Sequence, residues 1–176
     1  MKILKKIVSV GIASMMLLGL AGCSDDVSDV TLQTKTVNGV SLSVPSDFGE
    51  FTSSEGYMVA SGPNASLTIS PATADDSTPA DWTEQTIREA LQSEYSSMTF
   101  KSVTKGKAPN GEQAVYASFT AKSSDTTDST VYEVRLVMLF TDKGQLYINF
   151  IMFTEGDNSS TAKFADDIMK SMTVAK

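Results

Sequence analysis

The alternation of hydrophobic and polar residues predicts that much of the chain is extended. Valine and leucine alternate with serine over residues 40–44, which predicts a strand with one buried face that ends at Pro45. Asn38 and Gly39 precede it, and both residues tolerate the positive φ values that a tight hairpin turn requires. A second pair of strands is predicted at 56–60 and 67–70, on either side of a Ser-Gly-Pro-Asn turn.

The middle of the chain changes to a helical period before it becomes extended again. The sequence predicts a helix that begins near Pro79 and Asp81 and has one apolar face. That face consists of Trp82, Ile87, Leu91, Tyr95 and Met98. Residues 100–107 and 113–121 are then predicted as strands joined by an Asn-Gly turn, and a polar loop follows at 122–130.

The last third holds the two most hydrophobic strands and a second helix. Residues 131–140 place every second side chain on one apolar face, and residues 146–153 are apolar on both faces. A helix capped by Ser159 or Ser160 follows, with an apolar stripe of Phe164, Ile168 and Met172. Because a strand that is apolar on both sides must be covered on both sides, the predicted class is α+β: a central antiparallel sheet with helices on both faces, an α/β/α sandwich.

The first 22 residues have the pattern of a secretory signal. Three lysines precede an uncharged apolar run at residues 7–20, which as a helix would measure about 21 Å, less than the ~30 Å of a bilayer core. A short apolar run behind lysines is typical of a signal peptide and not of a transmembrane helix.

The end of this segment, Leu20-Ala21-Gly22-Cys23, resembles the lipobox of bacterial lipoproteins. The resemblance implies that Cys23 is lipidated and that Leu20, Ala21 and Gly22 are recognised by the signal peptidase. An ordinary signal peptide with an incidental cysteine is the alternative. Two or more acyl chains would anchor the protein stably.

The expected organisation is therefore a lipoprotein signal peptide at 1–22, a lipidated cysteine and flexible tether at 23–30, and a single domain at 31–176. The expected location is the cell membrane, with the lipid-anchored domain facing the outside or the periplasm. Loss of the signal lysines would make the net charge of −7 more negative still. This charge argues against nucleic acid or anionic lipid headgroups as the main partner.

Two stretches of the domain resemble the PsbP-like superfamily, which includes the DcrB-related proteins. "VSLSVPSDF" (40–48) is similar to the opening strand of that family, and "FADDIMKSMTV" (164–174) is similar to its last helix. The resemblance implies a PsbP-like domain over residues 37–174 and a non-enzymatic module that assists membrane-associated complexes. It assigns no binding residue.

Candidate catalytic chemistry is scarce in this sequence. It has no histidine, its only cysteine is Cys23, and it has no glycine-rich phosphate loop. We therefore predict no catalytic, cofactor-binding or metal-binding residue, and no enzyme. Three pairs of loop carboxylates allow two interpretations. The functional one is that they bind calcium, and the favoured one is that they are solvated surface charges. The pairs are Asp75/Asp76, Asp125/Asp128 and Glu155/Asp157.

Two further groups of residues allow a structural and a functional interpretation. Glu133 and Arg135 lie two positions apart on one strand face, so we expect either an ion pair or the polar lining of a pocket. Tyr57, Tyr116 and Tyr147 are expected to pack in strands, although they could also contact a partner.

The predicted function is that of a membrane-anchored envelope lipoprotein, non-enzymatic, that binds an envelope protein partner. The alternative is a lipoprotein that binds a small ligand or a divalent cation. An enzyme that uses carboxylates is the third possibility. A flat apolar patch on the folded domain would favour the first function, and a pocket with converging carboxylates would favour the second or the third.

Overall fold

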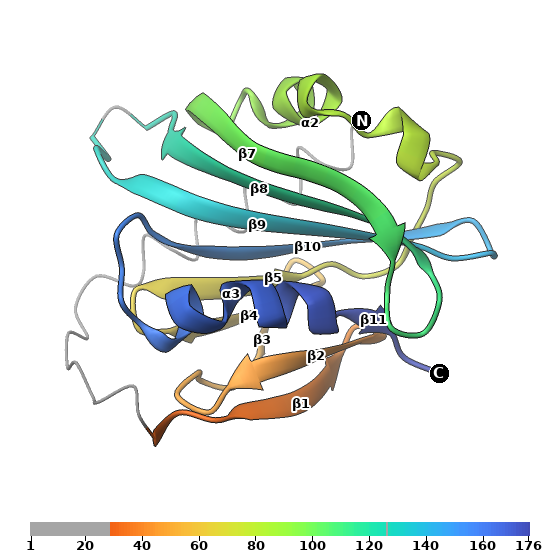
Figure 1. Ribbon diagram of the computed structural model, residues 1–176, viewed down its shortest axis with the longest axis horizontal. Coiled ribbons are helices and arrows are strands. Elements are labelled where there is room, and N and C mark those ends of the chain that lie inside the picture. Colours follow the sequence, from red (N-terminus) through yellow and green to blue (C-terminus); the bar gives the residue numbers. More distant parts are fainter. Residues whose placement is uncertain (1–28, 126) are drawn as a thin grey trace.

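The computed structural model describes residues 29–125 and 127–176, and these residues form mainly β-structure (Figure 1). Eleven strands, two α-helices and one short 3₁₀ helix are present in the described ranges. The strands are β1 (Leu32–Val37), β2 (Val40–Pro45), β3 (Thr52–Ser54), β4 (Tyr57–Gly62), β5 (Ala65–Ile69), β6 (Thr73–Ala74), β7 (Tyr95–Lys107), β8 (Gln113–Ser123), β9 (Val131–Phe140), β10 (Gln145–Thr154) and β11 (Thr173–Val174). The helices are η2 (Pro79–Asp81), α2 (Glu84–Leu91) and α3 (Ser160–Ser171).

The strands form two antiparallel sheets. The larger sheet has eight strands in the order β3-β4-β5-β10-β9-β8-β7, with β6 also paired to β10. The smaller sheet has three strands in the order β1-β2-β11, so it joins the first strands of the domain to the last one. Both faces of β10 are buried, as the sequence predicted.

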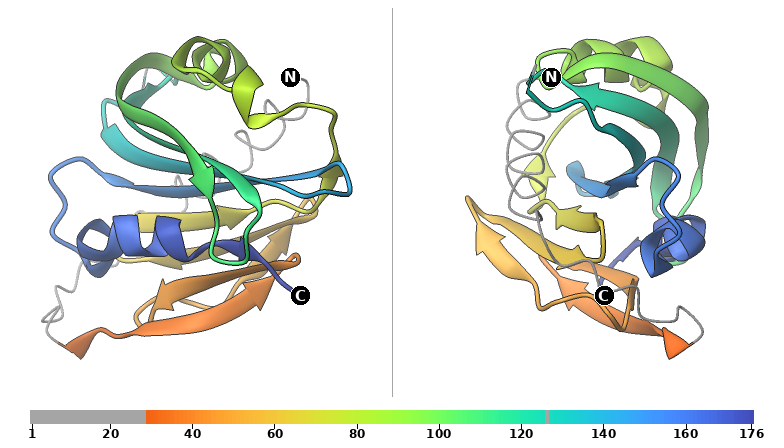
Figure 2. Two further views of the ribbon diagram at one scale, coloured as in Figure 1. Left: turned by 45° about the vertical axis from the view of Figure 1, so that its right-hand side comes forward. Right: turned by 90° about the vertical axis from the view of Figure 1, so that its left-hand side faces the viewer.

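The predicted α/β/α sandwich, with helices on both faces of the sheet, is wrong. One face of the large sheet is covered by the small sheet together with α3, and side chains from all three share one buried cluster. On the opposite face, residues from β4 near one edge and from β7 at the other share a second cluster, so the sheet curls over its own face (Figure 2). The two faces of β10 are thus buried mainly by the small sheet on one side and by the curled large sheet itself on the other.

The first helix is shorter than predicted. It ends at Leu91, and Tyr95 and Met98 belong to strand β7. The register shifts between Tyr95 and Ser97, which indicates a β-bulge there. Because the bulge inserts an extra residue, Tyr95 and Met98 both face the same buried cluster although they are three positions apart. In the sequence this spacing looks like one helical face.

The predicted turn at Asn38 and Gly39 is confirmed. These residues have φ values of 50° and 80°, and they connect paired strands β1 and β2. A Cβ atom at Gly39 would lie 3.3 Å from the hydroxyl oxygen of Tyr147. Glycine is therefore required by both the backbone and the close packing.

The segment after β2 connects three parts of the domain. Ser160 at the start of α3 donates a hydrogen bond from its hydroxyl to the Asp47 carboxylate at 2.5 Å. Phe48 lies against Gly62, where a Cβ atom would come within 2.4 Å of the aromatic ring. The Pro-Ser-Asp-Phe stretch that resembles the PsbP-like family therefore has a structural role here.

Candidate functional site

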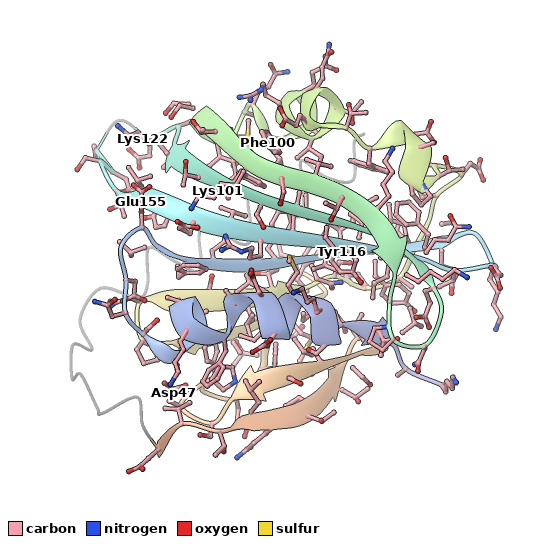
Figure 3. All side chains as sticks on the ribbon, in the orientation of Figure 1. Asp47, Phe100, Lys101, Tyr116, Lys122 and Glu155 are labelled. Carbon is pink, nitrogen blue, oxygen red and sulfur yellow. The ribbon has the colours of Figure 1, made fainter. Side chains whose placement is uncertain are left out.

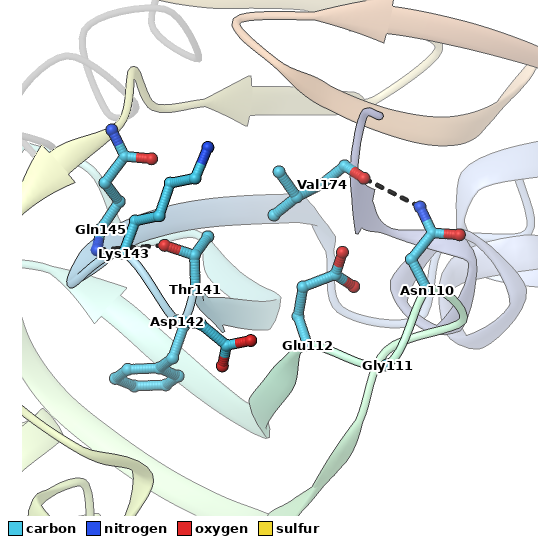
Figure 4. Close-up of a pocket in the computed structure, with 9 residues that line it drawn as sticks. Asn110, Gly111, Glu112, Thr141, Asp142, Lys143, Gln145 and Val174 are labelled. Atoms are coloured by element: carbon cyan, nitrogen blue, oxygen red, sulfur yellow. Dashed lines mark hydrogen bonds between the residues drawn. The ribbon is translucent and has the colours of Figure 1, made fainter.

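A pocket of about 340 Å³ lies where two hairpin turns meet the C-terminal strand (Figure 4). The turn at 108–112 connects β7 to β8, and the turn at 141–144 connects β9 to β10. Residues Asn110, Gly111, Glu112, Phe140, Thr141, Asp142, Lys143, Gln145 and Val174 line it. Its walls are thus brought together from three separate parts of the sequence.

Backbone hydrogen bonds give the first turn its shape. Ala108 donates its amide to the Glu112 carbonyl, and Gly111 donates to the Ala108 carbonyl, both at 2.9 Å. Gly111 has a φ of 98°, which a residue with a Cβ atom adopts only with strain. The turn therefore presents Asn110 and Glu112 in fixed positions at the pocket.

The second turn is built in a similar way. Thr141 donates its amide to the Gln145 carbonyl at 2.9 Å, and Gly144 donates to the Thr141 carbonyl at 3.1 Å. Asp142 and Lys143 occupy the tip between these bonds, and both side chains are exposed. The tip thus carries charge directly at the rim of the pocket.

A group of hydrogen bonds fixes the C-terminal strand to the first turn. The Asn110 side-chain amide donates to the Val174 carbonyl at 2.9 Å, and the Asn110 backbone amide donates to the Thr173 hydroxyl at 3.2 Å. That hydroxyl donates in turn to Glu112 Oε2 at 2.9 Å. The Glu112 carboxylate is therefore oriented by its neighbours.

The charges of the pocket are not paired with one another. Within residues 29–125 and 127–176, no ion pair within 4.0 Å includes Glu112, Asp142 or Lys143. Phe140 and Val174 add apolar surface beside them. Two carboxylates, one ammonium group and an apolar wall can bind and orient a small molecule.

The predicted ion pair between Glu133 and Arg135 is confirmed, and it is part of a larger network. Arg135 Nη1 lies 3.0 Å from Glu133 Oε2, and Arg135 Nε lies 3.1 Å from Asp166 Oδ1 on α3. Lys101 on β7 also pairs with Glu133. Burial raises the pKa of Glu133, but the hydrogen bonds from Lys101 and Arg135 outweigh it, so the pKa lies below its ordinary value.

This network connects strands and helix and does not line the pocket. Lys101 is on β7, Glu133 and Arg135 are on β9, and Asp166 is on α3. The Arg135 guanidinium also lies over the Phe153 ring at 5.5 Å from its centroid. The ion-pair interpretation of the sequence therefore accounts for these residues.

The carboxylates considered for calcium make local loop contacts. Asp125 Oδ1 accepts hydrogen bonds from the amide and the hydroxyl of Thr127, and these bonds lower the Asp125 pKa. Asp128 accepts from the Tyr132 hydroxyl and from the Thr130 amide. In the part of the chain that the structure describes, no three acidic, histidine or cysteine side chains converge as a metal site.

The remaining predicted residues are placed as follows. Tyr57 and Tyr147 are buried and Tyr116 is half-buried, so the packing interpretation of the tyrosines is confirmed. The predicted lipidation site Cys23 and the recognition residues Leu20, Ala21 and Gly22 lie outside the described residues. No helix within the described ranges is long and apolar enough to cross a membrane.

The sequence predicted the turn at 108–112 from its Asn-Gly pair and placed Phe140 in a strand, and charged residues flank both turns. No local pattern indicates that Glu112 and Lys143 face one cavity, because that depends on how β8, β9 and β10 pair. The charged residues at the two turns are the only feature of the sequence that could have indicated a binding site there.

Strand β7 is a second feature that could contact a partner. It has 13 residues, lies at one edge of the large sheet and contains no acidic residue. Lys101, Lys105 and Lys107 give it a positive charge in an otherwise acidic chain. Most of its residues are exposed (Figure 3).

Comparison with known proteins shows similarity in fold but not in sequence. Neither a protein-family model nor a curated protein matches the chain. A Pseudomonas aeruginosa protein of unknown function, PA94, matches with a TM-score of 0.51 and 16% identity, over 82% of this chain and 98% of that one. This similarity shows a shared fold.

Two other solved structures are similar at lower scores. A Bacteroides thetaiotaomicron protein has a TM-score of 0.49 and 19% identity over 78% of this chain and 46% of that one. The Saccharomyces cerevisiae Ran-binding protein Mog1p has a TM-score of 0.47 and 9% identity over 78% of this chain and 84% of that one. The solved structures that this chain resembles have a Mog1/PsbP-like fold, and the similarity concerns the fold alone. The predicted resemblance to the PsbP-like superfamily in sequence stays a prediction.

Proposed function

We propose that the chain is a membrane-anchored, non-enzymatic lipoprotein of the bacterial cell envelope whose domain binds a small ligand. The pocket between the two turns is the observation that carries the ligand-binding proposal, because charges of both signs without an ion-pair partner in the described ranges line it beside apolar surface. The lipobox sequence that ends at Cys23 supports the anchor. The absence of histidine from the sequence supports a role without catalysis.

The surface of the domain favours a ligand over a flat apolar docking site. Leu32 is the only large hydrophobic side chain classed as exposed among residues 29–125 and 127–176, and it is 36% exposed. A single exposed leucine does not form a patch. A flat apolar patch would favour protein binding and a pocket with carboxylates would favour ligand binding, and the pocket with two carboxylates is the stronger of these features here.

The pocket lies at the end of the domain opposite the proposed tether. The chain enters the domain beside Leu32, which pairs with Pro45, whereas Val174 at the pocket pairs with Val40 at the other end of β2. Strand β2 has six residues, so its two ends lie about 17 Å apart. Figure 1 shows β2 running between them. A domain tethered through residues 23–30 would thus hold the entrance of the pocket away from the lipid attachment point.

The anchor is tested by mass spectrometry of the protein purified from cells grown with a clickable fatty acid. We expect the label on a peptide that begins at Cys23, and no label on the Cys23→Ser variant. A protein that carries no label, is cut at another residue and is released from the membrane would contradict the proposed lipid anchor. It would not bear on ligand binding in the pocket.

Ligand binding is tested by NMR on the detergent-purified full chain, titrated with a fractionated metabolite extract. We expect at least one fraction to shift the amide signals of Gly111 and Gly144, which lie in the two turns. Shifts confined to other surfaces, or none with any fraction, would contradict ligand binding in this pocket.

Binding of an envelope protein is the second candidate function, and strand β7 is the observation that favours it. An edge strand can accept an extended segment of a partner through backbone hydrogen bonds. Lys101 is already paired with Glu133, so Lys105 and Lys107 are the charges that would select an acidic segment. They also disfavour a second copy, because two such edges would repel one another.

The partner hypothesis is tested with a photo-crosslinker at Ser102 on β7 and, as control, at Thr34 on β1, an edge strand of the small sheet. We expect one stoichiometric crosslink from Ser102 that is lost in Lys105→Glu and in Cys23→Ser. Equal crosslinking from both strands, or none from either, would contradict this function.

A further inference from the structure

We propose that the pocket selects a small zwitterion: a molecule that carries one ammonium group and one carboxylate on a short apolar body, such as a free amino acid. The inference rests on the ligand-binding function proposed above and names its ligand class. It is argued from the charge, the orientation and the size of the pocket.

The ammonium group of the ligand would meet Glu112 and Asp142. The Thr173 hydroxyl occupies Glu112 Oε2 at 2.9 Å, which orients the carboxylate and leaves Oε1 to accept a further hydrogen bond. Asp142 supplies a second carboxylate from the opposite turn (Figure 4). Charge-assisted hydrogen bonds to an ammonium group are among the strongest that such carboxylates make.

The carboxylate of the ligand would meet Lys143. This is the only positive side chain among the lining residues, and it makes no ion pair within the described ranges. A ligand with a single negative charge fits one ammonium group. A phosphate dianion fits poorly, because the two neighbouring carboxylates would repel it.

The size and the apolar wall restrict the rest of the ligand. A volume of about 340 Å³ is at the low end of the range for ligand pockets, which favours a small ligand over a nucleotide or an oligosaccharide. Phe140 and Val174 offer contact to a short aliphatic or aromatic group. Bare Ca²⁺ or Mg²⁺ is disfavoured, because these ions take six or more oxygen ligands and the lining residues include two carboxylates.

Three probes with the same apolar body separate the two charges. Leucine carries both, 3-methylbutylamine lacks the carboxylate, and 4-methylpentanoate lacks the ammonium group. We expect calorimetry on the detergent-purified full chain to show that leucine binds at least about tenfold more tightly than either single-charge probe. The amides of Gly111 and Gly144 should shift on binding.

Variants assign each charge to its side chain. Lys143→Met should bring leucine to the affinity of the amine. Glu112→Gln should weaken leucine binding in part, and the double variant Glu112→Gln/Asp142→Asn should bring it to the affinity of the acid. The amide oxygen that Glu112→Gln introduces can still accept from the Thr173 hydroxyl, so the fold of the turn is kept. Lys122→Met, at an exposed lysine near the other end of β8, is the matched control and should change nothing.

Several outcomes would overturn the inference. If the amine or the acid binds as tightly as leucine, or if none of the three binds, the pocket does not select zwitterions. The ligand-binding function itself would still stand if the metabolite fractions shift Gly111 and Gly144. If those fractions also leave the two signals unchanged, both proposals fail together.

Discussion

The two ends of the domain use their polar groups differently. At the tether end, Asp47 accepts from Ser160, Asp128 accepts from Tyr132, and Asn64 donates to Asp157. These bonds connect segments of the fold or close loops. At the pocket end, Asn110 and Glu112 are bonded to Val174 and Thr173 in the same way, but Asp142 and Lys143 make no ion pair among the described residues.

This difference indicates which polar groups contribute to the stability of the fold and which are available to bind a ligand. A polar group that is satisfied inside the protein stabilises the fold but has little capacity left for a ligand. A charge that is left unpaired at a pocket contributes little to stability and remains free to bind. We therefore expect substitutions at the tether end to destabilise the fold, and substitutions of pocket charges to change binding alone.

The largest effect is expected at Gly62. Its Cβ atom would lie within 2.4 Å of the Phe48 ring, so Gly62→Ala forces the ring out of its site. Overpacking of this kind costs about 1–3 kcal/mol. Urea denaturation should show that loss, and the double variant Gly62→Ala/Phe48→Leu should recover part of it. Unchanged stability in Gly62→Ala would show that Phe48 does not hold this end together.

The next effect is expected at Ser160. Ser160→Ala removes the hydroxyl that donates to Asp47 at the start of α3 and leaves the carboxylate without this partner. A hydrogen bond to a charged group contributes about 1.5–3 kcal/mol, and the exposed side of Asp47 allows water to replace part of it, so we expect a loss of about 1 kcal/mol. Ser159→Ala, which removes the helix N-cap, is the comparison within the same turn and should cost a similar amount. If Ser160→Ala leaves the free energy of unfolding unchanged, α3 is held in place by its apolar face alone.

The sequence predicted the features that depend on neighbouring residues. The Asn38-Gly39 turn, the alternating face of β9 and the capped final helix follow from local spacing and backbone preference. The curl of the sheet and the second sheet could not be predicted in this way, since they depend on strand pairing over long sequence separations. The pocket is of the same kind: Asn110 and Val174 are 64 residues apart.

A smaller effect concerns acid sensitivity away from the pocket. The pKa of Glu133 is lowered in the folded state, so its pairing with Lys101 and Arg135 stabilises the protein fully above the unfolded value of 4.5. The stabilisation is lost as the pH falls below 4.5 and through the folded pKa. Glu133→Gln should therefore be less stable than the parent at pH 7, and the difference should shrink as the pH falls below 4.5. A difference that stays constant over this range would show that the loss is due to packing and not to charge.

The smallest effect on stability is expected at the pocket. Asp142 and Lys143 are exposed, unpaired with other charges in the described ranges, and located at the tip of a turn. Asp142→Asn and Lys143→Met should therefore each change the free energy of unfolding by less than about 0.5 kcal/mol. Gly144→Ala in the same turn is the control: its φ of 66° makes a Cβ atom costly, by about 1 kcal/mol. If the two charge variants destabilise the fold as much as Gly144→Ala does, the charges hold the turn and the pocket end is built like the tether end. If they leave stability unchanged while leucine binding is lost, charge at this end serves the ligand.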